Sequence, residues 1–282
     1  MRLAILSTAI DAESRVLWEA RLATPLRAVG IEASLTGFAE ELDLRGFEAA
    51  TPLLAWGYHE RIDFWSKRLD DLERSGLPIL NPVAALRWNS RKTYLTELAE
   101  GGATIVPTVF VDEVTEPAVE TARARFGTPL VVVKPVVSAG AMSTVRLAPG
   151  DPLEGAPRGA AMIQPYLPAI VGEGEISMLY FGGRFSHAAV KVAAAHDFRV
   201  QARMGGAARA LPLPPREAFE AAEAVLAACP HRLDYARVDL IRGPDGAFAL
   251  MELEAIEPDL FLQFAPDEGA AFATAFARAL GI

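Results

Sequence analysis

The chain has 282 residues, 51% of them hydrophobic, and a formal net charge of −9 at pH 7. This length supports a large core divided over two or three lobes, and the apolar fraction excludes a disordered chain. The acidic balance argues against nucleic acid as the main partner, and no apolar run is long enough to cross a membrane.

Two features indicate where the protein works. The apolar start, residues 1–7, is too short for a signal peptide and predicts a first core strand instead. Cys229 is the single cysteine, which excludes an internal disulfide and fits a reducing cytoplasm. We therefore expect a cytoplasmic enzyme or small-molecule binder that uses neither nucleic acid nor membrane as a partner.

The first part of the chain alternates strand and helix patterns. The predicted strands cover residues 3–6, 31–35 and 51–56, and the predicted helices cover 12–28 and 61–74. Such alternation implies a small parallel sheet with helices on its faces. We assign residues 1–87 to this N-terminal β/α domain.

Two α+β regions follow, which we place at 88–165 and 166–282. In the first, we expect a helix over 91–100 capped by Asn89 or Ser90, a helix over 117–126, and strands over 105–111, 130–133, 145–147 and 161–164. In the second, we expect strands over 175–181, 188–192, 236–241 and 248–254, and helices over 215–228 and 268–280. The fold class is therefore α/β, in the broad sense that includes α+β.

A lysine, Lys134, ends the apolar run of the strand over 130–133. At the mouth of a buried strand, its ammonium group could lie over a phosphate. The residues that follow, 136–144, are mostly small, which lets backbone N–H groups approach a triphosphate. No Walker loop is present, because the chain lacks that motif and this loop leads into a strand. An ordinary hairpin loop is the alternative interpretation.

Three weaker clusters have both a structural and a functional interpretation. Arg91 and Lys92, in the expected first turn of a helix, are either solvated or reach an anion from a neighbouring lobe. The strand over 161–164 breaks at Pro165 into an extended segment that could read an adenine edge or serve as a linker. Arg199 and Gln201 are expected on one strand face, where Arg199 could bind a carboxylate or phosphoryl group.

Two strands near the C-terminus carry carboxylates between apolar neighbours. Residues 243–246 form a turn, and an even-numbered loop would place Arg237, Asp239, Glu252 and Glu254 on one face. A divalent cation such as Mg²⁺, which prefers carboxylate oxygens, would relieve the repulsion between them. A solvent-facing polar sheet face is the alternative.

In chain order, these features resemble the ATP-grasp superfamily of carboxylate–amine ligases, in its glutathione-synthetase-like branch. The matching segments are 89–92, 131–135, 164–167, 174–177, 197–201 with Gly205-Gly206, 237–240 and 251–254. Segments 56–59, 87–89 and 253–258 also resemble a subgroup that contains a D-cycloserine-forming ligase. The resemblance implies an N-terminal β/α lobe followed by two α+β lobes that clamp ATP.

The resemblance also implies roles for individual residues. ATP would be bound by Lys92, Lys134, the loop with Ser138, Ala139, Gly140 and Ser143, the adenine site with Gln164, Tyr166 and Leu167, and Glu175 at the ribose. One or two Mg²⁺ ions, or Mn²⁺, would be held by Asp239, Glu252 and Glu254. Arg199, Lys191 and Gln201 would act at the reacting group, and the candidates for substrate contact are His59, Arg61, Gly205 and Gly206.

The implied reaction is an ADP-forming ligation, in which a small carboxylate becomes an acyl phosphate and an amine displaces the phosphate. Glu254 departs from the Asn that is common in relatives, and Gly57 stands where the subgroup often has an acidic residue. A phosphotransferase with a hydroxylated substrate and a catalytically silent nucleotide-binding module are the alternatives. A homodimer is consistent with the resemblance.

Overall fold

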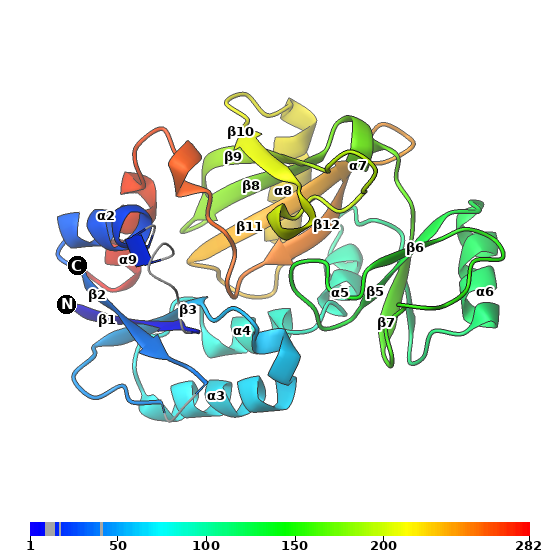
Figure 1. Ribbon diagram of the computed structural model, residues 1–282. Helices are drawn as coiled ribbons and strands as arrows, with labels where there is room; N and C mark the ends of the chain where they lie inside the picture. Colours follow the sequence, from blue (N-terminus) through cyan, green and yellow to red (C-terminus); the bar gives the residue numbers. More distant parts are fainter. Residues whose placement is uncertain (9–14, 17, 40–41) are drawn as a thin grey trace.

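Three β-sheets, each built from a separate stretch of the chain, make up the molecule (Figure 1). The computed structural model describes residues 1–8, 15–16, 18–39 and 42–282. Within these residues, no helix is both long and apolar enough to span a membrane. One parallel and two antiparallel sheets with flanking helices give the mixed α/β class that the sequence predicts.

The N-terminal sheet is parallel and has the strand order β2-β1-β3. Its strands are β1 (Arg2–Ser7), β2 (Glu32–Gly37) and β3 (Ala49–Leu54). Residues 3–6 are fully buried, as expected for a parallel strand covered on both faces. Trp65, Leu69 and Leu72 recur at helical spacing and bury one face of α3 (Ile62–Ser75). The three predicted strands and the helix over 61–74 are confirmed.

Shorter helices connect this sheet to the rest of the chain. They are η1 (Glu19–Ala23), α2 (Thr24–Ala28) and η2 (Tyr58–Arg61). The helix predicted over 12–28 is confirmed in its second half, whereas residues 12–14 and 17 lie outside the described residues. From the far end of the chain, Phe272 and Phe276 of α9 (Ala270–Ala279) join the core of the N-terminal sheet.

The central sheet is antiparallel, with the strand order β4-β7-β5-β6. Its strands are β4 (Val109–Val111), β5 (Val131–Pro135), β6 (Val145–Leu147) and β7 (Ala161–Pro165), and α6 (Glu116–Phe126) packs against it. The strand predicted over 105–111 is wrong in its first half. Pro107 has no N–H to donate there, and Ile105 forms only an isolated bridge to Leu250.

The C-terminal sheet is antiparallel, with the strand order β10-β9-β8-β11-β12. Its strands are β8 (Glu175–Phe181), β9 (Arg184–Val192), β10 (Ala207–Ala210), β11 (Tyr235–Arg242) and β12 (Phe248–Glu254). One face packs against α8 (Arg216–Ala228) in a common apolar cluster. Strand β10 was not predicted, because its alanine-rich sequence has little β propensity. The short helices here are α7 (Ala169–Gly172), η3 (Ala202–Met204) and η4 (Leu262–Phe264).

The helix predicted over 91–100 is confirmed from Tyr94 onward as α5 (Tyr94–Glu100), and a helix that was not predicted, α4 (Val83–Asn89), precedes it. Neither predicted cap is formed. The Asn89 side chain instead donates to the carbonyl of Leu253 and accepts from the N–H of Ala255. The Ser90 hydroxyl donates to the carbonyl of Leu86. Lys92 therefore lies in the turn between the two helices, where the backbone N–H donates to the carbonyl of Val136 at 2.9 Å.

Candidate active site

A cavity of about 510 Å³ lies where the segment after β3, the central sheet and the C-terminal sheet meet. Most of the residues singled out from the sequence line it. They are His59, Lys92, Lys134, Ser138, Ala139, Gly140, Gln164, Tyr166, Leu167, Glu175, Lys191, Arg199, Gln201, Gly206, Asp239, Glu252 and Glu254. Three predicted residues do not line it, although each is next in the sequence to a residue that does. They are Ser143, Arg61 and Gly205.

The hairpin of β11 and β12 brings its charged residues together in the predicted way, but by a different route. Arg237 pairs with Glu254 and Asp239 pairs with Glu252 across the strands. The loop at 243–247 has an odd number of residues, so a regular register would place Asp239 opposite Met251. A bulge between Asp239 and Leu240 leaves Met251 unpaired and restores the predicted pairing.

Asp239 is the centre of a buried network of charges. Its carboxylate, 1% exposed, accepts hydrogen bonds from the Ser177 hydroxyl (2.6 Å), the Lys191 ammonium (2.8 Å) and the Arg237 guanidinium (2.9 Å). Burial opposes ionisation, but the charges of Arg237 and Lys191 outweigh it and hold the pKa of Asp239 below its usual range. Asp239 is therefore an ionised, paired group in this structure.

The same two cations also hold the neighbouring glutamates. Arg237 pairs with Glu254, and Lys191 pairs with Glu175. Burial, followed by repulsion from Glu252, raises the pKa of Glu254 to about 7 despite the charge of Arg237. Glu175 was expected at a ribose, and in the structure its carboxylate is occupied by Lys191.

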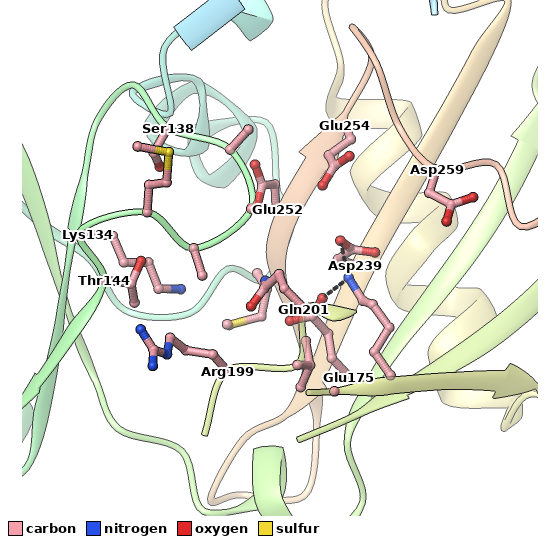
Figure 2. A pocket seen from close by; sticks show the side chains of 18 of the residues that line it. Lys134, Ser138, Thr144, Glu175, Arg199, Gln201, Asp239, Glu252, Glu254 and Asp259 are labelled. Atoms are coloured by element: carbon pink, nitrogen blue, oxygen red, sulfur yellow. Dashed lines mark hydrogen bonds and ion pairs between the residues drawn. The ribbon is translucent and has the colours of Figure 1, made fainter. Parts of the chain in front are cut away.

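Three of the four lysines in the chain line this cavity. The ammonium of Lys92 pairs with Glu252 at 2.6 Å and donates to the carbonyl of Ser138 at 2.8 Å, which connects it to the loop after β5. Lys134 forms no ion pair with any described residue, and burial lowers its pKa. Figure 2 shows Lys134 on the same side of the cavity as Arg199, across from Glu254 and Asp259.

Arg199 and Gln201 lie in a loop between β9 and η3, so the prediction that they share a strand face is wrong. Arg199 binds both carboxylate oxygens of Asp197 through its guanidinium. The Gln201 Oε1 atom is buried and accepts no hydrogen bond from the described residues. Gly206 follows this loop, and only glycine fits there, because a Cβ would lie 2.2 Å from the carbonyl oxygen of Val200.

The segment after β3 forms the remaining wall. The imidazole Nε2 of His59 lies 3.4 Å from the Met142 sulfur, and thus touches the loop that follows β5. The guanidinium of Arg61 stacks on the ring of Phe64 at 4.3 Å and does not line the cavity. Among the lining residues that were not predicted as site residues are Tyr58, Met142, Arg203 and Glu257. Of these, Tyr58, Met142 and Glu257 lie in segments that the sequence analysis singles out, and Arg203 does not.

The donor set of the hairpin suits a hard divalent cation, because Asp239, Glu252 and Glu254 are all carboxylates that line one cavity. Among the described residues, however, there is no group of three or more aspartate, glutamate, histidine or cysteine side chains that could hold a metal ion. Each of these carboxylates is instead bound to a lysine or an arginine.

Comparisons with known proteins identify the class. No family model matches the chain. It is 30% identical over 277 residues to the cycloserine biosynthesis protein DcsG of Streptomyces lavendulae, covering 90% of this chain and 91% of DcsG. The crystal structure of D-cycloserine synthetase DcsG superposes with a TM-score of 0.86 at 27% identity, covering 99% of this chain and all of that one.

More distant structures share the fold. D-alanine–D-alanine ligase from Bacillus anthracis has a TM-score of 0.72 at 17% identity, covering all of this chain and 98% of its own. An ATP-grasp RimK domain protein from Sphaerobacter thermophilus has a TM-score of 0.68 at 17% identity, with both chains fully covered. The fold is that of ATP-grasp ligases, and these relatives are ADP-forming carbon–nitrogen ligases. The chain belongs to the ATP-grasp superfamily and, within it, to the subgroup that contains DcsG.

Proposed function

We propose that the cavity binds ATP together with Mg²⁺ and a small carboxylic acid, and joins that acid to an amine through an acyl phosphate. The observation that carries this proposal is the meeting of three lysines and the carboxylate hairpin in one cavity between the lobes. A cavity enclosed by lobes excludes water, which would otherwise hydrolyse the intermediate.

The nucleotide has a consistent place in this cavity. Lys92 and Lys134 would contact the phosphates under the loop at 138–143, Gln164, Tyr166 and Leu167 would line the adenine, and Glu175 would bind the ribose. Lys134 supports this placement, because it is a partly buried cation without an acidic partner among the described residues. The D-alanine–D-alanine ligase of Bacillus anthracis, which shares the fold, has been crystallised with ATP.

Asp239, Glu252 and Glu254 would hold the Mg²⁺, which when bound neutralises charge on the phosphate oxygens. In the structure these carboxylates are bound by Lys92, Lys191 and Arg237, so metal binding requires the cations to exchange partners. Release of Lys92 from Glu252 would free its ammonium for a phosphate. Arg199, which pairs with Asp197 in the structure, would stabilise the phosphoryl group in transfer.

The chemistry follows from the poor leaving ability of a carboxylate oxygen. A carboxylate oxygen of the acid attacks the γ-phosphorus and ADP leaves, which forms the acyl phosphate. The amine then attacks the acyl carbon, phosphate departs, and the amine loses a proton. Because DcsG is named for cycloserine, a small cyclic amide, we propose an acid of amino-acid size. The cytoplasmic location, the homodimer and the domain boundaries at 87/88 and 165/166 stay predictions.

Hydroxylamine trapping tests the proposed function. With ATP, Mg²⁺, hydroxylamine and a panel of small amino and hydroxy acids that includes D-alanine, we expect a hydroxamate from at least one acid, and none when EDTA replaces Mg²⁺. ADP release without hydroxamate would instead indicate a phosphotransferase. No ADP release above background with any acid would indicate a silent nucleotide-binding module.

A further inference from the structure

Glu257 is a carboxylate of the cavity wall that the proposed reaction does not use. It follows the end of β12 by three residues, lines the cavity and is partly exposed to it. Within the described part of the chain, it forms neither an ion pair nor a hydrogen bond. Burial, then repulsion from Glu254, raises its pKa well above the usual range of a glutamate.

The other carboxylates of the cavity are accounted for. Lys191 holds Glu175 and Asp239, Lys92 holds Glu252, and Arg237 holds Glu254. Asp259 accepts the backbone N–H of Phe261 at 2.9 Å, and Glu60 is exposed to solvent. Among the carboxylates that the structure describes in this cavity, Glu257 alone is partly buried and has neither a cation nor a hydrogen-bond donor as partner.

Arg237 and Lys92, the two cations whose charges lower the pKa of Glu257, are already engaged. The guanidinium of Arg237 already donates to Asp239, to Glu254 and to the backbone carbonyl of Asp259. The ammonium of Lys92 is divided between Glu252 and Ser138. Figure 2 shows Glu254 and Asp259, which lie on either side of Glu257 in the chain, across the cavity from Lys134 and Arg199. One side of the cavity is therefore suited to phosphate and the other to a group that donates hydrogen bonds.

A second acceptor in the same cavity lacks a donor. The Oε1 atom of Gln201 is buried and has no hydrogen-bond partner in the described chain. A buried acceptor without a donor costs free energy, which a ligand carrying N–H groups would recover. Two acceptors without donors in one cavity thus call for hydrogen-bond donors on the ligand, and the carboxylate of Glu257 favours a cationic donor such as an ammonium group.

We propose that Glu257 is the residue of this chain that binds the amine of the substrate acid. The inference rests on the proposed function and deepens it, because it places the amine next to the end of β12 while the nucleotide lies toward Lys134. Glu257 acts here as a specificity-determining residue, since an acid without the amine would leave its carboxylate unpaired.

Calorimetric titration of the protein loaded with ADP and Mg²⁺ tests the proposal. The probes are D-alanine and D-cycloserine, each compared with its amine-free analogue, propanoate and isoxazolidin-3-one. We expect at least one amine to bind the wild type roughly ten- to a hundredfold more tightly than its analogue. E257Q should lose this preference, whereas E60Q, which removes an exposed carboxylate of the same cavity, should keep it.

The possible outcomes separate this proposal from the proposed function. ADP affinity equal to that of the wild type shows that E257Q is folded. A preference for the amine that survives in E257Q, or a wild type that binds neither amine more tightly than its analogue, would overturn the role of Glu257 while nucleotide binding stands. A wild type that does not bind ADP at all would overturn the proposed function itself.

Discussion

Lys134 stands out among the individual residues because its side chain is partly buried without an acidic partner in the described structure. Lys92 and Lys191 line the same cavity, but each is held by at least one carboxylate. A buried ammonium is costly unless an anion compensates it, and burial accordingly lowers its pKa. The missing anion is most simply a phosphate of the nucleotide.

Substitution of this lysine should therefore weaken nucleotide binding. We expect K134M to bind a non-hydrolysable ATP analogue with Mg²⁺ roughly ten- to a hundredfold more weakly than the wild type, because a charge-assisted contact is lost. K67M is the matched control, since Lys67 is the exposed fourth lysine of the chain and should leave affinity unchanged. Equal affinities of K134M and wild type, measured by calorimetry, would rule out this role.

At the residue scale, the sequence predicted positions better than side-chain directions. Lys134 was predictable because an apolar strand run ends on it before Pro135. Arg61 was predicted at the cavity because it is close in sequence to His59, but its guanidinium stacks on the ring of Phe64 and does not line the cavity. Glu257 gave no signal of its own, because nothing in the chain shows which carboxylates will receive a cation once β11 and β12 are folded.

At the scale of elements, two asparagines hold the ends of the site hairpin. Asn81 donates to the carbonyls of Tyr235 and Ala255 and accepts from the backbone N–H groups of Asp234 and Tyr235. Asn89 donates to the carbonyl of Leu253 and accepts from the N–H of Ala255. They are the only asparagines in the sequence, and both are buried. They connect the segments around α4 to the start of β11 and the end of β12.

Removal of the Asn81 carboxamide should destabilise the fold, because it leaves four buried backbone groups without this partner. We expect N81A to lower the free energy of unfolding by about 2–4 kcal/mol. Q263A, which removes an exposed carboxamide, should stay within about 0.5 kcal/mol of the wild type. Urea denaturation measures both, and an N81A midpoint indistinguishable from that of Q263A would contradict the account.

The elements themselves were largely predictable from hydrophobic periodicity, and the exceptions have local causes. The pairing of Asp239 with Glu252 depends on a bulge at Met251, which no alternation pattern reveals. The break between α4 and α5 occurs because Asn89 serves the end of β12 instead of capping the next helix. In both cases a long-range contact outweighs a local preference.

At the scale of the whole molecule, the order of the three sheets along the chain followed from the sequence, but their mutual packing did not. The return of α9 to the N-terminal sheet, through Phe272 and Phe276, joins the two ends of the chain in one core. An amphipathic helix pattern predicts that such a face is buried without saying against what. The cavity exists only because these long-range contacts bring the lobes together.

The central claim is that the protein activates a carboxylate as an acyl phosphate, and an isotope experiment tests it most directly. The acid that gives the strongest ADP release is labelled with ¹⁸O in its carboxylate and incubated with the enzyme, ATP, Mg²⁺ and amine. Because phosphate departs with the bridging oxygen of the acid, each inorganic phosphate should carry one ¹⁸O atom by mass spectrometry. Phosphate without ¹⁸O, formed while ADP accumulates, would contradict the account.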